Sequence, residues 1–372
     1  MVNEATTTVP ERWAPKFFII WAGQAFSLVG SALVQFALVW WMTRTTGSAT
    51  VLATATLVAL LPQILLGPFV GALVDRWNRR VIMIVADTSI AAATGVLIVL
   101  FSTGLVQVWH VYAILLVRSL GGAFHHPAMT ASTSLMVPRS QLARVAGMNQ
   151  TLQGVLSVFS PPLGALIIGL LPMHGVLAID IGTAALAVLP LLFLAIPNPP
   201  RQAAVADGTT RKTSYWHDLA EGFTYVVKWP GLLGLILLAM LLNFLLIPSS
   251  SLTPLVVTKL YGKGVVELGW TETMFGVGVI LGGLVLSAWG GFKRKIITSL
   301  VGVLGIGIGV ILVGVAPDNL FYLILVANFV MGITQVFANG PLTDNIPISH
   351  RSGYAGPGPL AHQCRRRSHD AS

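Results

Sequence analysis

The stretch Gly71-Ala-Leu-Val-Asp75-Arg76-Trp-Asn-Arg79-Arg80 concentrates charge in a chain that otherwise has very little. Three arginines and one aspartate fall within six positions, whereas charged residues make up 9% of the 372 residues. About 25 almost uncharged residues precede the stretch and about 20 apolar residues follow it, and runs of this length can cross a bilayer as helices. The stretch therefore predicts a tight cytoplasmic turn between two membrane helices.

The composition excludes a water-soluble domain. Hydrophobic residues make up 55% of the chain, and soluble domains carry about 25% charged residues instead of 9%. The net charge of +9 does not indicate nucleic acid, because the basic residues lie in short loops between apolar runs. The single cysteine, Cys364, excludes a disulfide framework and a multi-cysteine metal site. The expected partner of the chain is a lipid bilayer.

Ten runs have the length of a membrane-spanning helix. They are continuous rather than alternating, so an all-α polytopic bundle is expected and a β-barrel is not. The ten predicted spans are Phe17–Met42, Ala49–Val74, Val81–Phe101, Val108–Thr130, Arg144–Leu170, Gly175–Ile196, Pro230–Val257, Leu268–Gly291, Ile296–Ala316 and Leu320–Leu342.

The distribution of Lys and Arg predicts the orientation. With the N-terminus in the cytoplasm, 18 of the 22 basic residues fall in inner segments. The outer loops hold only Arg44, Lys259 and Lys263, and Arg118 lies within a span. Because basic residues favour the cytoplasmic side, the sequence predicts a multi-pass protein of the cytoplasmic membrane with a cytoplasmic N-terminus.

The chain divides into two membrane halves. Residues 1–196 form a six-helix half, 197–229 a cytoplasmic linker, 230–342 a partial half of four helices, and 343–372 a polar tail. A weak repeat supports this division, because a second glycine-led helix end at Gly283 also leads into a basic turn, Lys293-Arg294-Lys295. A second half of six helices would need two more spans. A reading-frame shift or truncated gene is the preferred explanation of the tail, and a disordered cytoplasmic tail is the alternative.

Several motifs resemble one transporter family. The loop Gly71-x-Leu-x-Asp75-Arg76-x-x-Arg79-Arg80 resembles the signature loop of the major facilitator superfamily, and Arg118-Ser-Leu-Gly121-Gly122 resembles its fourth-span pattern. Finer features are similar to the macrolide- and drug-efflux branch, namely Ile20-Trp-x-Gly-Gln24-Ala, Thr46-Gly-Ser48 and Leu61-Pro62-Gln63. The resemblance implies a helical bundle of two repeats, here with about 10 of the usual 12 helices.

The loop is expected to act in gating. Gly71 would allow two helices to approach closely. The resemblance implies that Asp75 latches the closed inner face against the start of an eleventh span, which this chain is expected to lack. The alternative for Asp75 is a solvated turn residue. For Arg76, Arg79 and Arg80 the alternative is simple anchoring on the cytoplasmic side.

Four intramembrane charges are candidates for ion coupling. Arg118 lies about ten residues into the fourth span and must face a cavity or a partner. The resemblance implies a role in proton coupling, and the alternative is a buried ion pair or carbonyl contact. Asp180 and Glu272 are each expected about one turn inside the outer surface, either titrating or reaching water. Asp87, near the inner end of its span, is expected to support the basic loop.

Six further residues are candidates for lining a substrate cavity. Five are amides within spans, which either line a cavity or join helices, and the sixth is an aromatic residue for a bulky solute. The six are Gln24, Phe26, Gln35, Gln153, Asn243 and Asn328. His125 and His126 lack further ligands, so no metal site is expected.

These features predict a secondary active transporter rather than an enzyme. No P-loop sequence is present, so no ATP site or other cofactor is expected. The expected function is proton-coupled efflux of a macrolide- or drug-like hydrophobic or amphipathic solute by alternating access, carried out by a monomer. The alternative is a truncated, non-transporting membrane protein or scaffold.

Overall fold

The computed structural model describes residues 13–194, 196, 224, 227–317 and 319–343, and in these residues it contains long helices and no strand. The first set comprises α1 (Trp13–Thr46), α2 (Ala49–Arg76), α3 (Arg79–Ser102), α4 (Val108–Met136), α5 (Leu142–Leu170) and α6 (Met173–Phe193). The second comprises α8 (Pro230–Leu255), α9 (Val265–Trp289), α10 (Lys295–Val315) and α11 (Phe321–Thr343). Short helical turns, η1 (Arg139–Gln141) and η2 (Val256–Leu260), precede α5 and extend α8.

All ten predicted spans are helices, which confirms the all-α class. Nine of the described helices are long and apolar enough to cross a membrane. The other is α4, whose apolarity is reduced by Arg118 and three histidines, although it packs against α2 and α3. The predicted linker and tail lie almost entirely outside the described residues, so the predicted domain boundaries remain predictions.

Local signals in the sequence set several helix ends. The Ser48 hydroxyl accepts a hydrogen bond from the Val51 amide at the start of α2. The Asn78 side chain accepts hydrogen bonds from the amides of Arg80 and Val81, and so α3 begins with only two residues between it and the end of α2. Gly290 adopts φ 76° after α9, a left-handed conformation that glycine takes without strain. The two predicted basic turns are therefore both helix boundaries.

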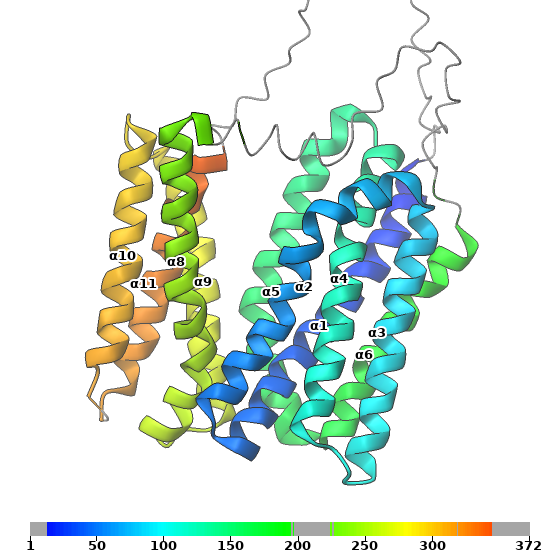
Figure 1. The fold of residues 1–372 in the computed structure, drawn as a ribbon, viewed down its shortest axis with the longest axis horizontal. Coiled ribbons are helices and arrows are strands. Elements are labelled where there is room, and N and C mark those ends of the chain that lie inside the picture. The colour runs from blue at the N-terminus through cyan, green and yellow to red at the C-terminus, as the bar shows by residue number, and fades with distance from the viewer. Residues whose placement is uncertain (1–12, 195, 197–223, 225–226, 318, 344–372) are drawn as a thin grey trace, which may run out of the picture.

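The helices form two bundles that meet mainly along the seam between α5 and α9, with a smaller contact between α8 and α2 (Figure 1). Helices α1 to α6 pack together, and α9, α10 and α11 pack together. The seam joins α5 to α9, where Gly276 lies against the backbone of Ser157. The Thr273 hydroxyl crosses the same seam to the Val158 carbonyl at 3.3 Å. Small residues here allow two helix backbones to approach closely.

The bundles share a hydrophobic core at one end only. Phe36 of α1, Ala165 of α5, Val257 of η2 and Leu268 of α9 belong to one buried cluster that crosses between the bundles. The cluster at the opposite end, around Phe17, contains residues of the first bundle alone. In Figure 1 the bundles accordingly converge at the bottom, at the C-terminal end of α1.

We predict that Gly276→Ala destabilises the protein. A Cβ atom at Gly276 would lie 2.7 Å from the Ser157 carbonyl oxygen, and backbone cannot move aside as a flexible side chain would. Overpacking of this kind costs about 1–3 kcal/mol, so the apparent unfolding temperature in detergent should fall. Gly283→Ala, in the same helix, is the matched control because nothing lies within 4 Å of its Cβ position. Equal unfolding temperatures for the two variants would contradict the close packing of α9 against α5 at Gly276.

Candidate functional site

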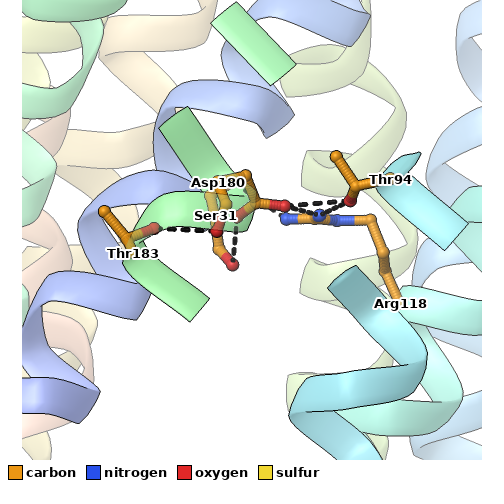
Figure 2. Close-up of polar contacts among 5 residues, drawn as sticks. All are labelled: Ser31, Thr94, Arg118, Asp180 and Thr183. Atoms are coloured by element: carbon orange, nitrogen blue, oxygen red, sulfur yellow. Dashed lines mark hydrogen bonds and ion pairs between the residues drawn. The ribbon is translucent and has the colours of Figure 1, made fainter. Parts of the chain in front are cut away.

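The candidate site lies inside the first bundle, where α1, α3, α4 and α6 meet. Gly30 of α1 permits this arrangement, because a Cβ atom there would lie 2.1 Å from the Thr183 hydroxyl oxygen and 3.2 Å from the Asp180 Cα. The close approach places the next residue, Ser31, beside the Asp180 side chain (Figure 2). One glycine thus positions α1 against the only acidic residue of α6.

Arg118 and Asp180 form a buried ion pair. Nη1 of Arg118 lies 2.6 Å from Oδ2 of Asp180, and their side chains are 10% and 2% exposed. The Thr94 hydroxyl donates to the same carboxylate oxygen at 3.0 Å and accepts from Arg118 Nη1 at 3.1 Å. Figure 2 shows these groups converging from α3, α4 and α6. The buried ion pair expected as the alternative for Arg118 is present.

Two further polar atoms of the pair also have partners. The Ser31 hydroxyl donates to Oδ1 of Asp180 at 3.2 Å, and Arg118 Nη2 donates to the Ser31 carbonyl at 3.3 Å. The depth of Asp180 below the outer surface remains a prediction, but the alternative in which its side chain reaches water is wrong. Asp180 lies about two turns into α6 and is 1% exposed, because its neutralising partner is inside the bundle.

A second buried carboxylate lies on α3. Asp87 accepts a hydrogen bond from Gln24 Nε2 to Oδ2 at 3.0 Å. Its Oδ1 lies 3.3 Å from Nε2 of His125, an approach without hydrogen-bond geometry. The expectation that Asp87 supports the basic loop is therefore wrong. The residue lies more than two turns into α3 and is 6% exposed, held by side chains of α1 and α4.

Both carboxylates border one cavity of about 190 Å³. Asp87, Arg118, His125 and Asp180 all line it, and its other walls are neutral. These other lining residues are Gln24, Ser27, Leu28, Ser31, Ile90, Gly122 and Ala184. The cavity is thus a polar chamber within the first bundle, bordered by one ion pair and one further acid.

Of the six predicted cavity residues, only Gln24 lines this cavity. Phe26 is 56% exposed, and the helical period places it on the face of α1 opposite Gln35. Asn328 donates to the Ile324 carbonyl of its own helix at 2.9 Å. Gln35, Gln153 and Asn243 have exposed side chains. Their contribution to a larger substrate site remains a prediction.

The arginines of the basic loop bind helix ends. Nε and Nη2 of Arg80 donate to the carbonyls of Leu191 and Leu192 in the last turn of α6, the second at 2.6 Å. Carbonyls of a last turn lack intrahelical donors and favour a cation. Arg79 is 7% exposed and donates to the Ala131 carbonyl of α4 at 3.5 Å. These residues therefore hold α3 to α4 and α6 in addition to any anchoring at the membrane surface.

The rest of the loop is less constrained. Nothing lies within 4 Å of a Cβ placed on Gly71, so the expected close helix approach at this glycine is absent among the described residues. Asp75 and Arg76 form the end of α2, and their side chains lie outside the described residues. The latch role of Asp75 remains a prediction.

Glu272 lies apart from the cavity, in α9. It is seven residues after the first residue of that helix, about two turns rather than one, and is half-buried. Its neighbours one turn away, Gly269 and Gly276, face α5. Within the described part of the chain, no hydrogen bond or ion pair joins its carboxylate. A titrating role for Glu272 remains a prediction.

Sequence reasoning did not identify Ser31, Thr94 or His125 as part of the site. One signal for the ion pair was available, because Arg118 and Asp180 are opposite charges within spans and each needs a partner there. Nothing in the sequence marks Thr94 among the many hydroxyl residues of the chain. The helix arrangement alone selects it.

We predict that single changes in the ion pair cost more than the double change. Asp180→Asn leaves Arg118 buried without its counter-ion, and Arg118→Gln does the same to Asp180, each at about 3–5 kcal/mol. The double variant leaves no charge uncompensated, so the four proteins should show a strongly non-additive cycle of apparent unfolding temperatures. Additive effects would mean that the two charges do not interact.

Comparison with known proteins agrees with this architecture. The family model described as Major Facilitator Superfamily matches residues 20–356. Macrolide efflux protein A of Streptococcus pyogenes is 35% identical over 331 residues, which are 89% of this chain and 80% of the relative. The protein of the same description in Enterococcus faecalis is 33% identical over 297 residues, 80% of this chain and 90% of the relative.

A solved structure shares the fold at low sequence identity. The crystal structure of a mutant of the nucleoside transporter NupG has a TM-score of 0.65 at 15% identity, covering 89% of this chain and 82% of the other. The motifs at Gly71–Arg80 and Arg118 thus indicated the correct family, and the finer features around Gln24, Thr46 and Leu61 its macrolide-efflux branch. The chain belongs to the Major Facilitator Superfamily and is a multi-pass membrane transporter rather than an enzyme.

Proposed function

We propose that this protein is a proton-driven exporter of hydrophobic or amphipathic, macrolide-like solutes across the cytoplasmic membrane. The names of its relatives support efflux as the direction and macrolides as the solute class. The single observation that supports proton coupling is the Arg118–Asp180 ion pair at the wall of the polar cavity. The energy source is a proton gradient, with no ATP or other cofactor, and the working unit is the monomer.

Asp180 is the proposed proton carrier. Protonation makes the carboxyl neutral and removes most of its attraction for Arg118. The guanidinium then keeps only Thr94 and the Ser31 carbonyl as partners, and a charge with fewer partners favours a rearrangement that lets it reach water. Because Ser31 and Thr94 belong to α1 and α3, this rearrangement would change how those helices pack. Proton binding and helix movement are coupled through one side chain.

The packing of the two bundles supports alternating access as the transport mode. Their shared core lies at the end of the bundle that the Lys and Arg distribution assigns to the outside. At the opposite end, the core around Phe17 contains no residue of the second bundle. A molecule closed at the outer end and separated at the inner end is arranged to receive a solute from the cytoplasm or the inner leaflet. The halves would then rock about the α5–α9 seam.

Transport by the purified chain in liposomes tests the proposal. An imposed pH gradient should drive erythromycin against its concentration gradient, and Asp180→Asn should lose this accumulation while retaining downhill exchange. An asparagine side chain cannot take up the coupling proton, so accumulation of the solute should fall to the level of simple equilibration. Glu267→Gln is the matched control, since this carboxylate only caps α9 through the Gly264 amide. Undiminished accumulation in Asp180→Asn would overturn the coupling role.

The proposed orientation has its own test, because Cys364 is the only cysteine. With a cytoplasmic N-terminus and ten spans, the C-terminal segment lies in the cytoplasm. A membrane-impermeant maleimide should therefore label Cys364 in inverted vesicles but not in intact cells. Labelling in intact cells would reverse the assigned orientation.

A further inference from the structure

We propose that Asp87 is the docking point for a positively charged amine of the transported solute. The proposal rests on the proposed function and names a chemical group that the cavity recognises. The inference rests on the carboxylate, on its amide and imidazole neighbours and on the cavity that it borders. The Arg118–Asp180 pair lines the same cavity but makes no described contact with Asp87.

The charges around the cavity leave one acid without a lysine or arginine partner. Arg118 directs Nη1 to Asp180 and Thr94 and Nη2 to the Ser31 carbonyl, so none of its described contacts reaches Asp87. The cavity lining contains two carboxylates and one guanidinium, and the guanidinium pairs with Asp180. The other carboxylate is Asp87, whose side chain is 7% exposed.

The immediate partners of Asp87 are an amide and an imidazole. Gln24 donates to Oδ2, while Oδ1 faces His125 Nε2 without a hydrogen bond between them. A buried carboxylate without a guanidinium or ammonium partner is unfavourable, and it becomes favourable when such a cation reaches it. Within the described residues, Oδ1 of Asp87 accepts no hydrogen bond.

The size and walls of the cavity indicate what the cation is. A volume of about 190 Å³ is below the range of about 300–1,000 Å³ typical of whole drug-like ligands, so the cavity accepts one functional group of a larger solute. Leu28, Ile90 and Ala184 form apolar parts of the wall. Apolar walls around a carboxylate suit a methylated amine, whose charge pairs with the acid while its methyl groups contact the side chains. A hydrated inorganic cation would gain nothing from such walls.

Binding to the purified full-length chain in lipid nanodiscs tests this assignment. The probes are two erythromycin derivatives, one with its amine methylated to a permanent cation and one with its amine demethylated and acetylated, which is neutral. Wild-type protein should bind the cation more tightly than the neutral derivative. Asp87→Asn should abolish this preference, which amounts to about tenfold for one ion pair between the ammonium and the carboxylate. Binding of the neutral derivative reports whether the variant is folded.

A second pair of variants leaves Asp87 in place. His125→Lys supplies a permanent cation beside the carboxylate and should weaken binding of the charged derivative selectively. His125→Gln is the size-matched neutral comparison and should bind that derivative more tightly than His125→Lys does. Asp87 remains in both variants. The difference in their affinity for the charged derivative therefore reports competition between the introduced lysine and the amine of the derivative for the Asp87 carboxylate.

The outcomes separate this inference from the proposed function. If Asp87→Asn and His125→Lys keep the wild-type preference for the cation, the docking assignment is wrong, while proton-driven efflux in liposomes still stands. If the wild-type chain binds neither derivative and accumulates no erythromycin, macrolide efflux itself is wrong and the inference falls with it. A preference lost in Asp87→Asn and reduced in His125→Lys supports the assignment.

Discussion

The ion pair between Arg118 and Asp180 is the constraint on which the interior of the first bundle depends. Neither charge is stable alone among apolar helices, so each requires the other within hydrogen-bond distance. Satisfying the remaining donors and acceptors brings in Thr94 and Ser31, and with them α3 and α1. Four helices are thus held in one relative position by a single pair of charges. A change in the charge of either member must alter how all four pack.

The second carboxylate gives the same cavity a different chemistry. Asp180 has a guanidinium and two hydroxyls, whereas Asp87 has an amide and an imidazole. The two acids of this cavity therefore have different environments, because one is paired with an arginine and the other is not. That difference allows one site to respond to protons and the other to a cationic group of a solute. Coupling between them would need no long pathway, since both border the same cavity.

The connection between the bundles is of another kind. It consists of backbone-close packing along α5 and α9 and an apolar cluster at one end, with the Thr273 hydroxyl bond crossing the seam. Contacts of this type resist separation but carry little directional preference. The basic loop works differently, because Arg79 and Arg80 bind backbone carbonyls and fix helices within the first bundle. Directional hydrogen bonds thus fix the helices within the first bundle, whereas the second bundle is held against the first mainly by packing.

The sequence by itself determined the helices, the membrane and the family. Runs of apolar residues have no other stable form in lipid, so the ten spans and the basic turns between them follow directly from composition. The motifs around Asp75 and Arg118 determined the family. Only the tertiary structure decided which polar groups meet. Asp87 was expected to support the basic loop, and Asp180 was expected either to titrate or to reach water, since position along a helix gives depth but not the direction that the side chain faces. That direction depends on helix rotation and on close approaches such as the one at Gly30, which bring together residues far apart in the chain.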